Sequence, residues 1–101
     1  MIIITSKQNP LIKDVVKLLG DKKYRVAAGQ FVVEGVKPVR ECVAAGYAVD
    51  KILCTENYAE EFPRAHVLAD AVFNSLSTEK MPQGVMAVVK LPGNELKKVW
   101  K

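Results

Sequence analysis

The sequence predicts a small α/β domain, a three-layer α/β/α sandwich with helices on both faces of a mainly parallel sheet. Two observations predict this fold. Short apolar runs typical of buried strands alternate along the chain with segments of helical spacing. Strands separated by helices are usually joined by crossover connections, which make neighbouring strands parallel. The chain has 101 residues and half of them are apolar, which suits one domain with a modest core.

The first helix has clear boundary signals. The apolar start, residues 1–6, is either a first strand or a packed arm. Asn9 can then cap a helix, Pro10 suits its first turn and Gly20 can end it. The segment from Asp21 to Arg25 is expected to be a basic turn or a frayed extension of that helix.

A strand, a helix and a second strand are expected in the middle of the chain. Residues 30–34 are rich in β-forming types between two glycines, which predicts a strand buried on both faces. Residues 36–45 have helical spacing and stop at Gly46, and residues 51–54 form the next buried run.

The last part of the chain alternates in the same way. Thr55 is expected to cap a short acidic turn, and residues 66–68 to form a third short strand. Asp70 is a candidate cap for a further helix, and residues 85–89 are expected to form the last core strand. These alternating elements complete the predicted α/β pattern.

Positive charge is concentrated at the start of the chain. Fifteen basic and eleven acidic residues give a net charge of +4. The first 25 residues alone contain six basic and two acidic residues, so their balance equals that of the whole chain. Such a local excess is typical of a surface that binds a polyanion such as nucleic acid, although a solvated lysine-rich helix face would look the same.

Several other functional classes lack their signals. No apolar run approaches the ~20 residues of a membrane span, and no export signal is present, so a cytoplasmic location is expected. His66 is the single histidine and has no ligand cluster around it, so no metal site is expected. Cys42 and Cys54 are expected to be buried, reduced thiols, and no phosphate loop or catalytic constellation is present.

Four fragments of the sequence occur in a characteristic order and spacing. They are Ile4-Thr5-Ser6-x-x-Asn9-Pro10-x-Ile12-Lys13, Lys22/Lys23 with Arg25, Gly29-x-Phe31-x-Val33-Glu34-Gly35, and Pro82-Gln83-Gly84-Val85-Met86-Ala87-Val88. Together, over residues 2–90, they resemble the N-terminal substrate-binding domain of SpoU/TrmH-type RNA ribose 2′-O-methyltransferases. The resemblance implies RNA binding and a fold similar to that of large-subunit ribosomal proteins that bind kinked RNA.

The resemblance also implies that RNA binding and methyl transfer belong to two different domains. In that family this domain precedes a knotted SPOUT domain that binds S-adenosylmethionine, dimerises and performs the methyl transfer. Nothing after Gly93 resembles that domain. We therefore expect residues 1–91 to be the RNA-binding domain and residues 92–101 a linker toward a catalytic domain, with a natural tail as the alternative. The chain itself is expected to be inactive, with no cofactor and no catalytic residue, and to deliver ribosomal RNA or transfer RNA within a homodimeric parent enzyme.

Nine residues are candidates for contact with RNA. They are Asn9, Lys13, Lys22, Lys23, Tyr24, Arg25, Glu34, Gly35 and Gln83. The basic side chains can bind phosphates, Arg25 in bidentate fashion. Tyr24 either stacks on an unpaired base or folds into the core. Lys13 is placed for a phosphate contact near a helix start, where Asn9 is expected mainly as a cap.

The remaining candidates lie at predicted strand ends, where open parallel sheets usually bind ligands. Glu34 either accepts a hydrogen bond from a base edge or holds the basic residues in place by pairing with Arg25. Gly35 permits a tight turn from strand to helix. Gln83 either reads a base or caps a loop.

Two other functions fit the same residues. One is a stand-alone structural RNA-binding protein of the ribosomal kinked-RNA-binding type. The other is a protein–protein interaction module whose basic face only keeps it soluble. Binding to ribosomal RNA at physiological salt separates the second from both RNA-binding hypotheses.

Overall fold

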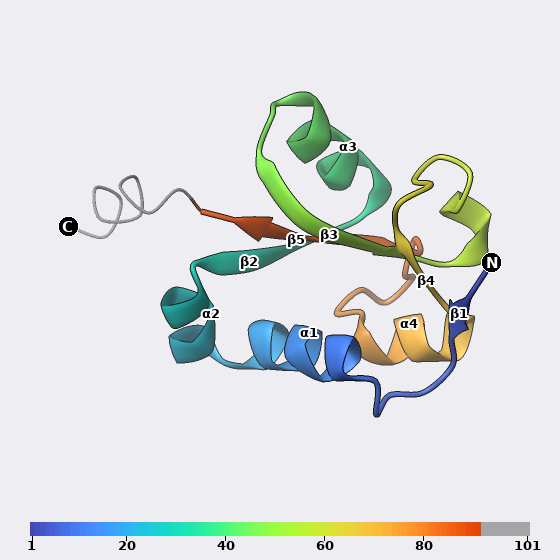
Figure 1. The fold of residues 1–101 in the computed structure, drawn as a ribbon, viewed down its shortest axis with the longest axis horizontal. Helices are drawn as coiled ribbons and strands as arrows, with labels where there is room; N and C mark the ends of the chain where they lie inside the picture. The colour runs from blue at the N-terminus through green and yellow to red at the C-terminus, as the bar shows by residue number, and fades with distance from the viewer. Residues whose placement is uncertain (92–101) are drawn as a thin grey trace.

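The computed structural model describes residues 1–91, and the predicted linker, residues 92–101, lies outside the described residues. Ten elements follow one another along the chain (Figure 1). They are β1 (Ile3–Ile4), α1 (Pro10–Gly20), α2 (Lys22–Ala28), β2 (Gln30–Glu34), α3 (Val36–Ala44), β3 (Ala48–Cys54), the 3₁₀ turn η1 (Glu56–Tyr58), β4 (His66–Leu68), α4 (Asp70–Leu76) and β5 (Val85–Lys90).

The five strands form one mixed sheet in the order β1-β4-β3-β5-β2. β1, β4 and β3 pair in parallel, whereas β5 is antiparallel to both of its neighbours, β3 and β2. The expectation of a mainly parallel sheet is therefore corrected. Its cause is the return segment after α4, residues 77–84, which brings β5 into the sheet in the direction opposite to the other four strands.

Helices cover both faces of the sheet, as predicted. Figure 1 shows α3 on one face and α1, α2 and α4 on the other. One apolar cluster lies on each face of the sheet. The strand β5 contributes residues to both clusters, because its side chains point alternately to the two faces. Met86 and Val88 join the cluster of α1 and α4, while Val85, Ala87 and Val89 join that of α3. All five are buried, so β5 is the central strand of the core.

The strand at 30–34 has the predicted bounds but a different environment. β2 is an edge strand whose only partner in the sheet is β5. Its five residues are half-buried, although Phe31 and Val33 pack on the α3 side and Val32 on the other. The expectation of full burial is thus wrong, because an edge strand leaves one flank without a neighbouring strand.

The first helix begins and ends at the predicted residues. The side chain of Asn9 accepts a hydrogen bond from Leu11 N at 2.9 Å, which caps α1. The expectation for the next segment is corrected, because residues 22–28 form the regular helix α2 and not a turn. Asp21 caps α2 by accepting from Tyr24 N at 3.1 Å, and Gly29 ends it with φ of +65°.

Candidate nucleic-acid interface

The exposed lysines of the first quarter of the chain lie on one layer of the domain. Lys13 and Lys17 are on α1, and Lys22 and Lys23 are on α2. The two helices follow each other beneath the sheet, on the side opposite α3 (Figure 1). Lys13 and Lys17 are four residues apart and therefore share a helix face. We call these four residues, with the exposed Lys7 in the preceding turn, the α1–α2 lysine surface.

Arg25 does not belong to this surface. Its Nη1 donates to the carbonyl oxygens of Leu18 at 2.6 Å and Leu19 at 3.1 Å, and the residue is half-buried. These carbonyls lie in the last turn of α1, where a helix has no internal donors for them. Arg25 thus joins α2 to the end of α1, and the hypothesis that it pairs with Glu34 is wrong.

Tyr24 is folded toward the core, the second of its two predicted arrangements. Its ring packs against the cluster beneath the sheet, and its hydroxyl donates to Asp14 Oδ1. This hydrogen bond to a carboxylate, followed by partial burial, raises the pKa of Tyr24. The Lys17 Nζ lies 5.6 Å from the centre of the ring, within the range of a cation–π contact. Lys17 and Tyr24 therefore hold each other in place on the α1–α2 side.

A short ion-pair chain continues from Asp14 to the ends of β3 and β5. Lys51 Nζ lies 3.9 Å from Asp14 Oδ2 and 3.2 Å from Asp50 Oδ2, and Lys90 Nζ lies 3.4 Å from Asp50 Oδ1. Burial alone would raise the pKa of Asp50, but the hydrogen bonds and charges of the two lysines outweigh it and lower the pKa. Lys51 and Lys90 are thus paired with carboxylates. In contrast, Lys7, Lys13 and Lys23 make no side-chain hydrogen bond or ion pair with any residue of 1–91.

Glu34, Gly35 and Gln83 meet at the far end of the sheet, away from α2. The carboxylate of Glu34 accepts from the Ser77 hydroxyl, from Thr78 N at 3.1 Å and from Thr78 Oγ1 at 3.3 Å. It therefore anchors the segment between α4 and β5. Gly35 is buried with φ of +111°, and a Cβ there would lie 3.3 Å from Gln83 Oε1, so the position favours glycine.

Gln83 caps a helix that is remote in the sequence. Its Oε1 accepts from Val36 N at 2.8 Å, which satisfies a free donor at the start of α3. Gly35, the residue before α3, has no side chain with which to do this. Gln83 thus has a capping role, but at the start of α3 and not within its own loop, and its contact with a base stays a prediction.

Replacing Gln83 by alanine is expected to lower the free energy of unfolding by about 1 kcal/mol, because Val36 N loses its acceptor. Glutamate keeps an oxygen at the same position and adds a charge that a helix start favours. We therefore expect Gln83→Glu to melt within a few degrees of the original protein, and Gln83→Ala below it, in a thermal unfolding measurement. Equal melting temperatures for both variants would contradict the cap.

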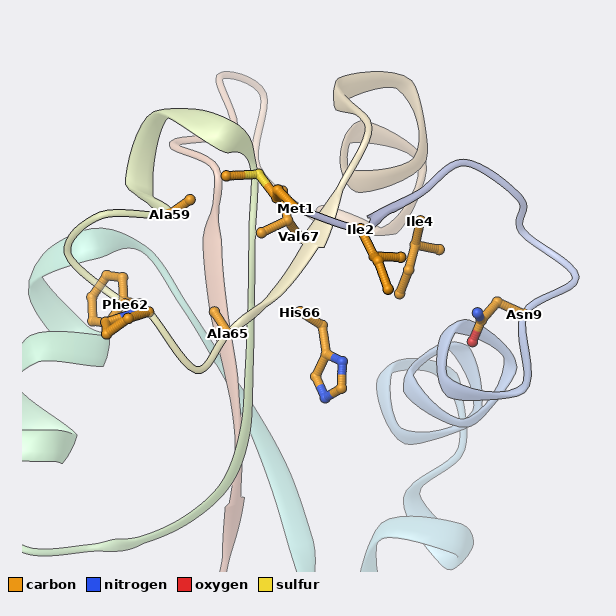
Figure 2. Close-up of a pocket in the computed structure, with 10 residues that line it drawn as sticks. Met1, Ile2, Ile4, Asn9, Ala59, Phe62, Ala65, His66 and Val67 are labelled. Atoms are coloured by element: carbon orange, nitrogen blue, oxygen red, sulfur yellow. The ribbon is translucent and has the colours of Figure 1, made fainter.

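A cavity of about 670 Å³ opens at the other edge of the sheet, where β1 and β4 face the start of α1 (Figure 2). Its lining is mostly apolar, and its polar side chains belong to Asn9 and His66. The full lining is Met1, Ile2, Ile4, Asn9, Ala59, Phe62, Pro63, Ala65, His66 and Val67. Nothing in the sequence except Asn9 indicates this cavity, because its walls come from distant segments. Within residues 1–91 no group of His, Cys, Asp and Glu side chains could hold a metal ion.

The predicted site residues therefore fall into three places. The lysines and Tyr24 lie on the α1–α2 side, Glu34 with Gly35 and Gln83 at one end of the sheet, and Asn9 at the cavity. None of the helices in the described part of the chain has the length and apolar character needed to cross a membrane.

Solved structures with a similar fold are RNA methyltransferases. An RNA 2′-O ribose methyltransferase is 27% identical, with a TM-score of 0.75, and the match covers 91% of this chain and 38% of that one. The SpoU methyltransferase AviRb from Streptomyces viridochromogenes, in complex with AdoMet, is 25% identical, with a TM-score of 0.72 and coverage of 91% and 39%. An rRNA methyltransferase from Sinorhizobium meliloti, 22% identical over 90% of this chain and 37% of that one, shares the fold with a TM-score of 0.73.

This chain spans less than two fifths of the length of these enzymes. No significant match was found among curated protein sequences. The family model described as the MRM3-like substrate binding domain matches residues 9–87, more than three quarters of the chain. These matches confirm the resemblance to the substrate-binding part of SpoU/TrmH-type enzymes. The chain therefore belongs to the family of MRM3-like substrate-binding domains.

Proposed function

We propose that this domain recognises RNA, ribosomal RNA in the first place, for a methyltransferase that modifies the ribose 2′-hydroxyl. The observation that carries the proposal is the α1–α2 lysine surface in a member of a substrate-binding family. Its lysines are exposed and belong to α1, α2 and the turn before α1, whereas Lys51 of β3 and Lys90 of β5 are paired with carboxylates. Exposed lysines are groups that bind phosphates.

Methyl transfer itself belongs, in this proposal, to another part of the parent protein, which residues 92–101 would connect to this domain. S-Adenosylmethionine carries a positive sulfonium group, and an exposed lysine surface repels such a ligand. The α1–α2 lysine surface is therefore suited to the RNA, and we place the methyl donor in that other part of the parent protein. The AdoMet-bound relative is more than twice as long as this chain, which leaves ample room for a separate cofactor site and a dimer interface. Such an enzyme would act in the cytoplasm.

We propose further that the RNA is bent or interrupted where it meets the domain, as expected from the resemblance to ribosomal kinked-RNA-binding proteins. A regular A-form duplex offers side chains only its backbone and shallow groove, whereas unpaired residues expose base edges and faces. A domain with a mainly apolar cavity beside a basic helix is suited to such exposed residues.

The test is the salt dependence of RNA binding, measured by fluorescence anisotropy with a labelled stem-loop of ribosomal RNA. Four to five lysine–phosphate contacts predict a slope of log K against log salt of roughly −3 to −4. We expect the stem-loop, or a duplex with a bulge, to bind more tightly than a fully paired duplex of equal length. The absence of binding at physiological salt would contradict the proposed function.

A further inference from the structure

The cavity beside β1 and β4 has the composition of a ligand site. Its volume of about 670 Å³ lies within the range of about 300–1,000 Å³ that small organic ligands occupy. Ile2 and Ile4 contribute apolar walls from the start of the chain, and Phe62 and Val67 line the part of the cavity on the α3 side of the sheet. Such walls suit a flat, weakly polar ring, and the identity of that ring depends on the few polar groups among them.

Asn9 offers the cavity a hydrogen-bond donor of fixed direction. Its Oδ1 accepts from Leu11 N at 2.9 Å, so the amide group cannot rotate without loss of the helix cap. The other end of the amide, Nδ2, has no hydrogen-bond partner within residues 1–91. The cavity therefore meets an NH₂ group held in place by the start of α1.

His66 offers an aromatic ring on the other side of the opening. Figure 2 shows its imidazole and the Asn9 side chain on opposite sides of the space between β4 and the start of α1. The imidazole is exposed and makes no hydrogen bond or ion pair with the residues the structure describes. The backbone of His66 is fixed by its pairing with Leu53 of β3, so the ring is presented from a rigid strand.

Two exposed lysines are close to Asn9 along the chain. Lys13 follows Asn9 by four residues, on the same side of α1, and its N donates to the Asn9 carbonyl at 3.0 Å. Lys7 lies in the exposed turn just before Asn9. An apolar slot with a donor, an aromatic ring and neighbouring cations matches a base that is attached to a phosphate.

We infer that this cavity binds one unpaired nucleobase of the RNA. In this inference the base lies between the apolar walls and the imidazole of His66, and Asn9 Nδ2 donates to an acceptor on the base edge. Lys13 and Lys7 hold the adjoining phosphates. The inference rests on the proposed function, which it extends from phosphate binding by the lysines to the recognition of a base.

The cavity can be tested with free nucleotides by NMR. We expect titration with the four nucleoside 5′-monophosphates to shift the side-chain signals of Asn9 and His66 and the methyl signals of Ile4. The dissociation constant of such a small ligand should be on the order of 1 mM. Ribose 5-phosphate carries the same charge without a base and should leave these signals in place. Equal shifts with ribose 5-phosphate, or no shift with any nucleotide, would overturn the inference.

Two substitutions test the polar groups with the stem-loop RNA. His66→Ala should weaken binding by at least about fivefold, the lower end of the effect of removing one base–aromatic stack. Asn9→Ser and Asn9→Asp both keep a capping oxygen and remove the NH₂ donor, so we expect weaker binding without a lower melting temperature. Tyr47→Ala is the control, because Tyr47 is an exposed aromatic residue that does not line the cavity.

A further variant covers the case in which His66→Ala unfolds. Ile2 is 91% exposed at the rim, so Ile2→Glu should leave the fold intact while placing a negative charge beside the base. It should reduce binding to the stem-loop more than to a fully paired duplex.

The outcomes separate the two proposals. Loss of RNA binding on removal of lysines, with no effect of the cavity variants, would overturn the base site and leave the proposed function standing. Nucleotide shifts without any binding of stem-loop RNA would overturn the proposed function and the RNA base as occupant, and would identify the cavity as a site for free nucleotides. A change of oligomeric state in the cavity variants, with unchanged RNA and nucleotide binding, would instead identify the cavity as a contact between copies of the chain.

Discussion

Replacing Gly84 by alanine is expected to lower the free energy of unfolding by about 2–4 kcal/mol and the melting temperature by roughly 10–20 °C. Gly84 is buried and has φ of +93°, a conformation that alanine adopts only under strain. A Cβ at this position would also lie 2.6 Å from Thr55 Oγ1. Thr55 cannot move away easily, because its N donates to the Gly84 carbonyl at 2.9 Å. Urea and thermal unfolding measure the loss.

Replacing Thr55 by alanine separates the backbone strain at Gly84 from the close contact with the Thr55 side chain. Thr55→Ala removes both Oγ1 and Cγ2, and the Cβ that remains at residue 55 would lie at 3.6 Å, an ordinary contact. In a Thr55→Ala background, Gly84→Ala should therefore cost only the backbone strain, about 1–2 kcal/mol. Gly20→Ala is the matched control, since Gly20 ends α1 with no atom near its added Cβ, and it should be neutral or slightly stabilising. Equal losses for Gly84→Ala in both backgrounds would contradict the contact.

Elements with local signals at both ends were predictable from the sequence. Asn9, Pro10 and Gly20 define α1 to the residue, because caps and breakers act over a single turn. The strand 66–68 also has its predicted bounds. The segment after α1 was expected as a basic turn or a frayed extension of that helix, whereas it forms the separate helix α2, with Asp21 and Gly29 at its two ends.

Strand order and direction were not predictable, because they depend on which segments meet in space. The crossover rule holds for β1, β4 and β3. It fails for β5, because residues 77–84 bring this strand into the sheet antiparallel to its neighbours although the helix α4 precedes them. The β-bulge between Val49 and Lys51 is likewise set by pairing with β5. It lets the side chain of Asp50 reach both Lys51 and Lys90, a contact with no sequence signature.

The candidate site shows the same limit. The sequence identified the basic segment, and the structure places its lysines on one layer. The sequence did not show that Arg25 has a different role from the lysines. Arg25 can reach the carbonyls of Leu18 and Leu19 only because α2 folds back against the end of α1. Gln83 was open between two roles because its partner, Val36, is 47 residues away. His66 was considered only as a metal ligand, since nothing in the sequence indicates a cavity.

Removing three lysines from the α1–α2 lysine surface is expected to reduce RNA affinity on the order of 50-fold at physiological salt. The variant is Lys13→Gln, Lys17→Gln and Lys23→Gln together, and glutamine keeps much of the length of each side chain. Each lost phosphate contact removes about 0.7 from the slope of log K against log salt, so the slope should become shallower by about 2. Arg25 is left unchanged, because its substitution would disturb the joint between α1 and α2.

A matched variant distinguishes a docking surface from net charge alone. Lys37, Arg64 and Lys80 are exposed cations on other elements, and their replacement by glutamine removes the same total charge. Long-range attraction depends on total charge and is screened within about 8 Å at physiological salt, whereas counterion release depends on direct contact with phosphate. The control should therefore retain its slope and lose little affinity. If both triple variants made the slope of log K against log salt equally shallow, RNA affinity would depend on the total charge of the domain. That result would contradict the α1–α2 lysine surface as the binding surface.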